Sequence, residues 1–366
     1  MPEQSSSPDA SLTQDDSFTE TSHRGLTYPW GKHAPETGDV VAVGDGIGWV
    51  RIPLPGSLGH INCWVLDDAD GDIAVVDSGI RLPGCIEAWE ALFTGPLAGK
   101  RVANIYATHM HPDHIGLVGW LAKRDGAPLH MTRGEWLTAK FAVADVQDEV
   151  PQAVLDFRHG AGWTAEQVEA SKSTGWGRMR GIIFHLPHSY VRIHDGDVLT
   201  IGSQQWRVIV GSGHSPEHAC LYNEAQNIMI AGDQLLPRIS SNVSLGASEP
   251  LANPLGEWIA SIDKLLATLP EDVLVLPAHG EPFRGAHVRL NALKSEHLER
   301  LDALADFVSE ASRTTVDCFP KLFYREIGDD HRGLATGEAL AHLRWLEVEG
   351  RITRDCVDGV WMWRGV

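Results

Sequence analysis

The sequence contains little cysteine, and its few thiols are spread widely along the chain. The five cysteines are an odd number, and no CxxC pair occurs. We therefore interpret them as free thiols in a reducing compartment, as expected of a cytoplasmic protein.

Long apolar runs are also absent. No stretch of about 18 apolar residues exists, so we expect no transmembrane helix. The first twenty residues contain no Lys or Arg and no apolar segment, which excludes a secretory signal peptide. Their Ser-, Asp- and Thr-rich composition predicts a disordered acidic tail over residues 1–24 with no catalytic role.

Positive charge is scarce. Thirty Lys and Arg stand against 49 Asp and Glu, giving a formal charge of −19. Such a charge repels phosphate backbones and anionic headgroups, so we expect a small-molecule substrate and no nucleic-acid or membrane partner. The 366 residues are 43% hydrophobic, enough for one large domain and a smaller one.

Segments rich in β-branched residues occur in two parts of the chain. They recur over residues 40–77 and again over 198–276, separated by Asp- and Gly-rich turns. Helical patterns lie between and after these parts. This order predicts an α+β fold, a four-layer αββα sandwich over residues 25–285.

The strongest chemical signal is the segment THMHPDH. It places His109, His111, Asp113 and His114 directly after a predicted strand, in a loop stiffened by Pro112. Neutral imidazole nitrogens and carboxylate oxygens are ligands that suit Zn²⁺. The loop geometry lets the first two histidines face one metal, and Asp113 and His114 face a neighbouring one.

Three further candidates each follow an apolar, strand-like run: His214, Asp233 and His279. A single histidine in a sequence is more often solvated or packed than bound to metal. The whole ordered set favours a metal site, because residue type, spacing and position after a strand would all have to coincide by chance.

These motifs resemble the metallo-β-lactamase superfamily, in its glyoxalase II-like and lactamase-like branches. The matching pieces are THMHPDH, GHSPEH, AGDQ and PAHG, in that family's order, between residues 25 and 284. The resemblance implies a first metal on His109, His111 and His214, and a second on Asp113, His114 and His279. Asp233 would bridge the two metals.

The same resemblance implies further roles. Asp77 would support the metal loop. Independently of the resemblance, metal-bound histidines usually donate their outer N–H to a carboxylate or carbonyl, and Asp77, Glu217 and His218 are candidates by proximity in sequence, although Glu217 and His218 could instead only cap a helix start. The HxH motif, rather than HxE, favours zinc hydrolysis over redox chemistry, with two Zn²⁺ as cofactors, or Mn or Fe.

The predicted function is that of a binuclear zinc hydrolase in which a metal-bridging hydroxide attacks a carbonyl. Asp113 is the expected catalytic residue, orienting the hydroxide and shuttling its proton. We expect an acyl thioester with a glutathione- or CoA-like leaving group, or a related ester. A lactonase, a metal-dependent nuclease or phosphodiesterase, and a non-catalytic binding protein are the alternatives.

A helical, tryptophan-bearing insert over residues 133–191 is the expected lid over the metals. His185 from this insert, together with Arg238 and Asn242 from the loop after Asp233, are candidates for contact with substrate. Arg238 could hold a carboxylate or phosphate, or could form only a surface ion pair.

The C-terminal part, residues 286–366, shows the order helix, helix, hairpin and resembles a winged-helix domain. Its eleven Lys and Arg and fourteen Asp and Glu give a formal charge of −3. A DNA reader would be basic, so we expect this domain to serve in packing, as a cleft wall or in a homodimer contact.

Overall fold

The computed structural model describes residues 19–366, so most of the predicted acidic tail, residues 1–18, lies outside the described residues. Strand β1 (Thr21–His23) pairs antiparallel with β2 (Leu26–Tyr28). Arg24 and Gly25, both with positive φ, form the turn between them. Regular structure thus begins before the boundary that the sequence suggested at residue 24.

The first of two large sheets has seven strands in sequential order. Its first four strands pair antiparallel, and the last four run parallel. The strands are β3 (Val41–Gly44), β4 (Ile47–Pro53), β5 (His60–Asp67), β6 (Ile73–Val76), β7 (Val102–Tyr106), β8 (Leu129–Met131) and β9 (Val191–Arg192).

The second large sheet has five strands, also in sequential order. All pairs are antiparallel except the last, β13 with β14, which is parallel. As a result β11, β13 and β14 point in the same direction. The strands are β10 (Val198–Ile201), β11 (Gln204–Gly211), β12 (His218–Asn223), β13 (Ile228–Gly232) and β14 (Leu274–Pro277).

Three layers of buried side chains hold the sandwich together. Trp64 and Trp206 lie between the two sheets. Trp89 packs in the layer that joins the first sheet to α1 (Pro83–Thr94) and α3 (Val118–Asp125), and Trp258 of α8 (Pro254–Thr268) packs against the second sheet. The predicted αββα sandwich is confirmed.

The C-terminal segment shows the predicted order of helix, helix and hairpin, with a short helix inserted. It comprises α9 (Ala286–Glu310), α10 (Phe319–Leu322), α11 (Asp329–Val348), β15 (Ile352–Val357) and β16 (Val360–Gly365). Leu340 and Trp363 belong to the same buried cluster as Trp258. This segment therefore shares one core with the sandwich.

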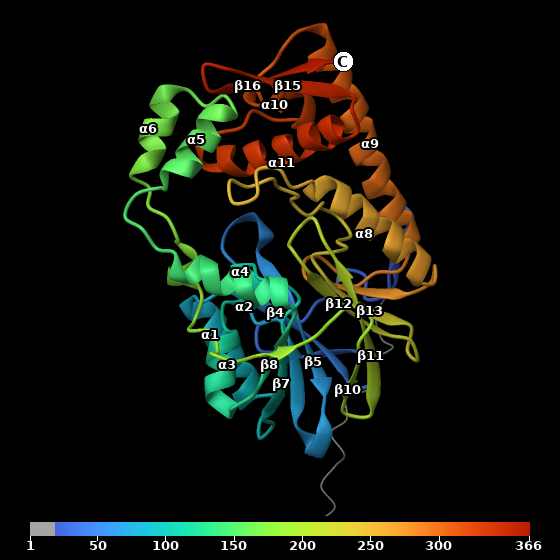
Figure 1. The fold of residues 1–366 in the computed structure, drawn as a ribbon. Helices are drawn as coiled ribbons and strands as arrows, with labels where there is room; N and C mark the ends of the chain where they lie inside the picture. The colour runs from blue at the N-terminus through green and yellow to red at the C-terminus, as the bar shows by residue number, and fades with distance from the viewer. Residues whose placement is uncertain (1–18) are drawn as a thin grey trace, which may run out of the picture.

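The predicted insert is helical, and its parts lie at two places in the molecule. Its helices are α4 (Arg133–Ala144), α5 (Gln152–Gly160), α6 (Ala165–Lys172) and α7 (Met179–Ile182). Figure 1 shows α4 against the sandwich, whereas α5 and α6 lie beside the C-terminal segment. There Phe157 meets Trp361 edge to face, and the Trp163 indole donates to Thr336 Oγ1 at 2.9 Å.

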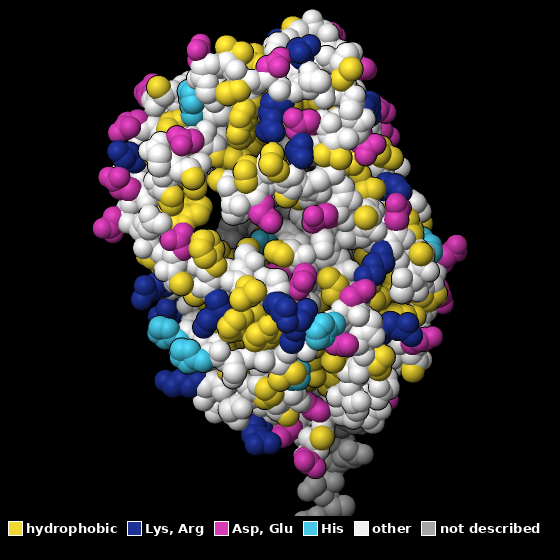
Figure 2. All heavy atoms as spheres, viewed as in Figure 1, with side chains coloured by type: hydrophobic (Ala, Val, Ile, Leu, Met, Phe, Trp, Pro, Cys, Tyr) yellow, Lys and Arg dark blue, Asp and Glu magenta, His cyan; other side chains and the backbone are white. Residues whose placement is uncertain are grey.

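The surface is hollowed between α4 and α11, and hydrophobic and acidic side chains surround the opening (Figure 2). The insert, by spanning from α4 to α5, forms one side of this hollow. Within residues 19–366, none of the helices is both long enough and apolar enough to cross a bilayer. All five cysteines are free thiols, as the sequence indicated.

Replacing Leu340 by Ala tests the shared core. Leu340 is fully buried in α11, and a cavity at such a site costs about 2–5 kcal/mol of unfolding free energy. Because the core is continuous, we expect far-UV circular dichroism and tryptophan fluorescence to shift together in urea. Two separated transitions, with only one moved by the substitution, would show that residues 286–366 unfold as an independent unit.

Candidate metal centre

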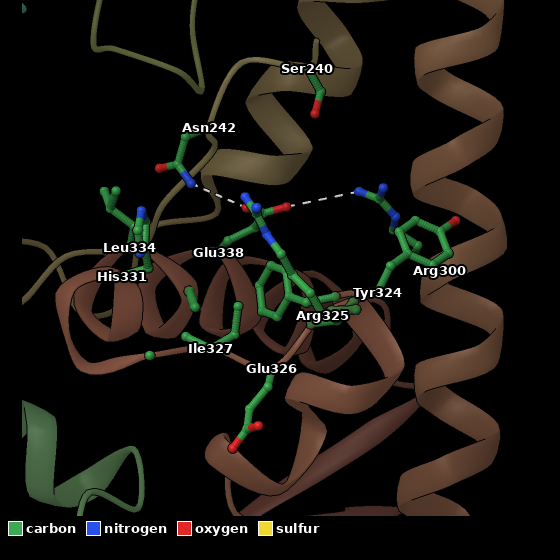
Figure 3. Close-up of a pocket in the computed structure, with 14 residues that line it drawn as sticks. Ser240, Asn242, Arg300, Tyr324, Arg325, Glu326, Ile327, His331, Leu334 and Glu338 are labelled. Carbon is green, nitrogen blue, oxygen red and sulfur yellow. Dashed lines mark hydrogen bonds and ion pairs between the residues drawn. The ribbon is translucent and has the colours of Figure 1, made fainter. Parts of the chain in front are cut away.

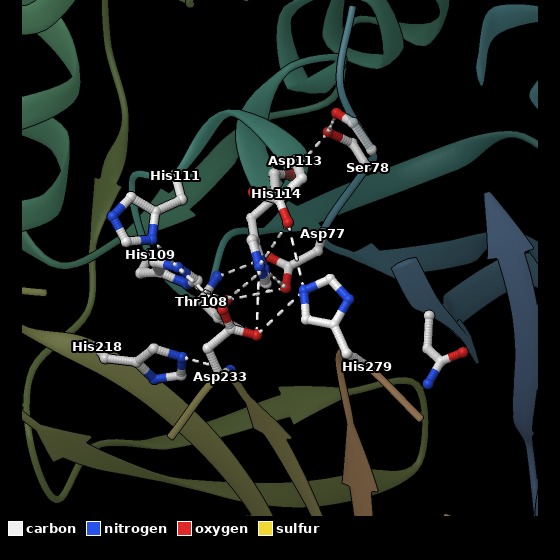
Figure 4. Close-up of polar contacts among 12 residues, drawn as sticks. Asp77, Ser78, Thr108, His109, His111, Asp113, His114, His218, Asp233 and His279 are labelled. Atoms are coloured by element: carbon white, nitrogen blue, oxygen red, sulfur yellow. Dashed lines mark hydrogen bonds and ion pairs between the residues drawn. The ribbon is translucent and has the colours of Figure 1, made fainter. Parts of the chain in front are cut away.

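Polar side chains follow four strands at one edge of the sandwich. His109 lies just after β7, His214 after β11, Asp233 after β13 and His279 after β14. Each of these strands ends at the same edge, so loops from both sheets meet there (Figure 4). Buried strands fix where each loop begins, and this brings side chains together from positions far apart in the sequence.

The first group of converging atoms comes from His109, His111, His214 and Asp233. His109 Nε2 lies 2.8 Å from His111 Nδ1 and 3.3 Å from His214 Nε2. Asp233 Oδ2 lies 3.3 Å from His214 Nε2 and 3.9 Å from His109 Nε2. Three imidazole nitrogens and one carboxylate oxygen thus face a common point.

The second group comes from Asp113, His114 and His279. Asp113 Oδ2 lies 3.3 Å from His279 Nε2 and 3.6 Å from His114 Nε2. The other oxygen of Asp233, Oδ1, is 3.5 Å from each of these two histidine nitrogens. Asp233 therefore stands between the groups and presents one oxygen to each.

Two atoms test whether this site suits metal ions. Asp233 Oδ1 and His114 Nε2 are buried, and within the described residues neither has a hydrogen-bond partner. Buried polar atoms are nearly always satisfied, so these two need a further partner. A cation between them would supply it, and nitrogen and carboxylate donors are those that Zn²⁺ prefers. The residues fit a pair of metal ions, and all seven sequence-predicted ligands meet here.

The outer nitrogens of three of the histidines are held by acceptors. His114 Nδ1 lies 2.7 Å from Asp77 Oδ2, the partner that the sequence suggested. His214 Nδ1 lies 2.7 Å from the carbonyl oxygen of Asn242, and His279 Nδ1 lies 3.0 Å from that of His60. With Nδ1 donating to these oxygens, each Nε2 is left as a lone-pair donor that faces the centre.

Asp77 also fixes the start of the histidine-rich segment, whose second half is not the predicted loop but the short helix α2 (Pro112–Ile115). Its Oδ1 accepts from the Thr108 backbone N–H and its Oδ2 from the Thr108 hydroxyl, both at 2.8 Å. Asp77 itself has a φ of 61°, a left-handed conformation uncommon for residues other than glycine. One carboxylate thereby locks both the backbone before His109 and the ring of His114.

Glu135, which the sequence gave no reason to select, joins two ligand loops. It is fully buried at the first turn of α4. Its carboxylate accepts from Met110 N at 2.9 Å, from Glu217 N at 2.7 Å and from the Ser215 hydroxyl at 2.6 Å. Burial raises the pKa of Glu135 despite these donors. A carboxylate in a predicted helix gives no signal that it points inward.

The last two residues of the GHSPEH motif, Glu217 and His218, support the site at different places. His218 is buried, its ring stacks on His109 at 4.8 Å, and its Nε2 accepts from the Asp233 backbone N–H at 3.0 Å. Glu217 Oε2 accepts from Gly134 N at 2.7 Å. Glu217 therefore caps the start of α4, the simpler of its two predicted roles, and His218 positions the bridging aspartate.

The electrostatics of the two groups differ. Burial, and then its neighbour His214, lower the pKa of His111 to about 3, and burial holds that of His109 well below its ordinary value. Burial also disfavours a charged His114, but Asp77 and Asp113 raise its pKa well above the ordinary value. His109 and His111 thus present neutral imidazoles, which metals require, and the second group retains a proton when metal-free.

The three predicted substrate contacts fall in different places. His185 is exposed, with its ring against Phe184. Arg238 forms an ion pair with Glu281 at 3.0 Å and lies over the ring of Tyr28. This is the surface ion pair that the sequence allowed as the alternative to a substrate contact. Asn242 reaches the centre through its main-chain carbonyl, so its contact with His214 is one of support.

The chain matches two protein-family models. Residues 56–307 match the family model described as the metallo-beta-lactamase superfamily, and residues 301–366 match one described as the metallo-beta-lactamase-like C-terminal domain. The winged-helix description of the C-terminal segment stays a prediction.

Among the relatives, the probable metallo-hydrolase YqjP of Bacillus subtilis is 25% identical over 87% of this chain and 95% of its own. The acyl-coenzyme A thioesterase MBLAC2 of Homo sapiens is 26% identical over 71% and 86%. A beta-lactamase domain protein from Burkholderia ambifaria has a crystal structure with TM-score 0.83 and 35% identity. The match covers 94% of this chain and all of that one.

Asp77→Asn tests the support of the metal loop. The amide cannot accept from His114 and from both Thr108 donors, and loss of such a partner typically weakens metal binding about 10–100-fold. Chelator competition measures the two dissociation constants. Asp72→Asn, which removes a surface ion pair with Arg101, is the control. Unchanged zinc affinity in Asp77→Asn would refute this role.

Metal binding near neutral pH is expected to release protons. The raised pKa of His114 means that the metal-free site holds a proton there, whereas a metal needs the neutral imidazole. Binding therefore displaces the proton, and affinity falls as pH falls. Calorimetry in PIPES, HEPES and Tris measures this, because the apparent enthalpy then follows the ionisation enthalpy of the buffer. Equal enthalpies in all three would contradict it.

Proposed function

Because the chain belongs to the metallo-β-lactamase superfamily and is a metal-dependent hydrolase, we propose that it holds two metal ions and hydrolyses an acyl thioester. The observation that carries the proposal is Asp233, whose two carboxylate oxygens face two separate ligand groups. A single-metal site would need only one of them.

The assignment of ligands follows the geometry. The first ion would be held by His109, His111 and His214, the second by Asp113, His114 and His279, and Asp233 would serve both. Two zinc ions, or manganese or iron, supply a water acidified towards neutral pKa and a Lewis acid for a carbonyl oxygen.

Asp113 is the proposed catalytic residue. Its side chain keeps 20% of its surface exposed, against 11% for Asp233. Burial raises the pKa of the Asp113 carboxyl, but His114 and His279 outweigh this and hold the pKa below its ordinary value. Asp113 is therefore ionised and can orient the attacking water and accept its proton.

Leaving-group chemistry favours a thioester. A thiol has a pKa of about 8.5, so a thiolate can depart without being protonated. The site offers metal ligands and proton acceptors, and a departing amine would in addition need a proton donor. The name of the human relative, an acyl-coenzyme A thioesterase, agrees with this substrate class.

A cavity of about 500 Å³, drawn in Figure 3, shares Asn242 with the support of the metal centre and suits the leaving group. Asn242 lines it and contacts His214, so the cavity is one residue away from a ligand. Arg300 and Arg325 line it together with apolar side chains such as Leu334, and the carboxylates of Glu326 and Glu338 line it as well. This mixture fits a phosphate-bearing thiol such as CoA, and we assign the cavity to that part of the substrate.

A hydrolysis screen with metal-quantified protein tests the proposal. Thioesters, lactones, β-lactams and phosphodiesters are compared, with the same acyl group carried on CoA and on the small neutral thiol N-acetylcysteamine. We expect thioester cleavage, with the higher kcat/KM for the CoA substrate. Cleavage of phosphodiesters alone, or of none of the thioesters, would overturn the assignment.

Asp113→Ala should lower kcat for the thioester by about 100-fold or more, because proton transfer by a positioned group contributes about 10²–10⁴-fold. Metal content is measured in the same samples to separate loss of chemistry from loss of an ion. Asp358→Asn, in the turn of the C-terminal hairpin, is the control. An Asp113→Ala protein with full activity and two metals would rule out the role.

A further inference from the structure

The loop after Asp233 touches the metal centre at two points but has no regular secondary structure of its own. Residues 239–245 form neither helix nor strand. The Asn242 carbonyl accepts from His214 Nδ1 at 2.7 Å, and the Ser241 hydroxyl donates to the carbonyl oxygen of Asp233. No strand ladder holds this loop, so its position depends on whatever else it contacts.

Arg289 of α9 donates to the Ile239 carbonyl at 2.9 Å at the start of the loop, and helix α11 contacts the part of the loop that reaches His214. The Leu245 backbone N–H donates to the Gly337 carbonyl at 3.0 Å. Gly337 permits a close approach, since a Cβ there would lie 2.8 Å from the Ser244 side chain. At the next residue of the helix, Glu338 Oε2 accepts from Asn242 Nδ2 at 3.2 Å. Two consecutive residues of α11 thus hold the loop.

Glu338 is held in turn on its other side. Figure 3 shows its carboxylate between Asn242 and Arg300, with dashed lines to both. The Arg300 guanidinium lies 3.9 Å away, and the Glu338 side chain is 20% exposed. Arg300 belongs to α9, so the carboxylate joins two C-terminal helices to the loop.

We propose that Glu338 is a positioning residue for the metal centre: it holds Asn242, whose main-chain carbonyl fixes the ring of His214. The C-terminal segment is then part of the support for the first metal, in addition to forming a wall of the cavity. This inference rests on the metal pair of the proposed function but not on the substrate.

The proposal predicts a selective loss of metal affinity. Glu338→Ala should raise one of the two metal dissociation constants by on the order of tenfold and leave the other unchanged. Tenfold is the lower end of the effect seen for outer partners of metal ligands. Glu338→Gln should retain most of the affinity, because its amide oxygen can still accept from Asn242. Chelator competition with zinc measures both constants without any substrate.

Glu347 provides a matched control. It lies on the same helix, is 19% exposed and pairs with Arg344 and Arg354, but none of its described contacts reaches the metal loops. Glu347→Ala should therefore leave both metal constants unchanged. A loss of affinity equal to that of Glu338→Ala would show that α11 acts only through general stability, and would overturn the proposal.

A double-mutant cycle tests the route through Asn242. If Glu338 acts through that side chain, Asn242→Ala and Glu338→Ala together should cost little more metal affinity than either alone. Additive losses would overturn the route. So would a Glu338→Ala protein with wild-type constants, or one in which the affinities for both metals fall together with the melting temperature of the metal-free protein.

The same measurements separate the two proposals. If the wild-type protein binds two zinc ions but cleaves no thioester, the substrate assignment fails and the role of Glu338 is still tested. If it binds fewer than two ions, the binuclear function fails first.

Discussion

Asp233 lies between the two ligand groups, and the loops that carry the other ligand candidates are arranged around its carboxylate. Its Oδ2 lies 3.3 Å from His214 Nε2 and 3.9 Å from His109 Nε2, and its Oδ1 lies 3.5 Å from the Nε2 atoms of two further histidines. A buried carboxylate is costly unless opposite charge or donors compensate it. Loops from both sheets bring the compensating groups to this carboxylate.

The supporting residues follow from this arrangement. Neutral imidazoles must present one nitrogen inward, and each outer nitrogen therefore needs an acceptor. Asp77 and two main-chain carbonyls, those of His60 and Asn242, fill that role. His218 accepts from the backbone of Asp233 itself. These contacts leave the rings and the Asp233 backbone little room to shift, because an unsatisfied buried group costs roughly 1–3 kcal/mol.

The two additions to the sandwich both contribute to this support. The insert supplies Glu135, which joins the loops of His109 and His214. The C-terminal segment supplies Gly337 and Glu338, which hold the loop of Asn242. The additions also pack on each other and share a core with the second sheet. The insert and the C-terminal segment therefore belong to the same folded unit as the metal centre.

The sandwich and the set of metal-ligand candidates could be predicted from local sequence patterns. Strand periodicity is local, and HxHxDH places four donors within six residues, so both can be seen without a fold. The sequence also pointed to Asp77 as a support. The order of helices and hairpin at the C-terminus was equally visible.

Contacts between groups far apart in the chain could not be predicted in this way. Glu135 and Glu338 lie in helices where a carboxylate normally faces water, and nothing local marks them as buried. Arg238, selected for its position after Asp233, turned out to pair with Glu281. The start of regular structure at Thr21 likewise depends on pairing with β2. Such contacts are set by packing between elements far apart in the chain, which no local pattern encodes.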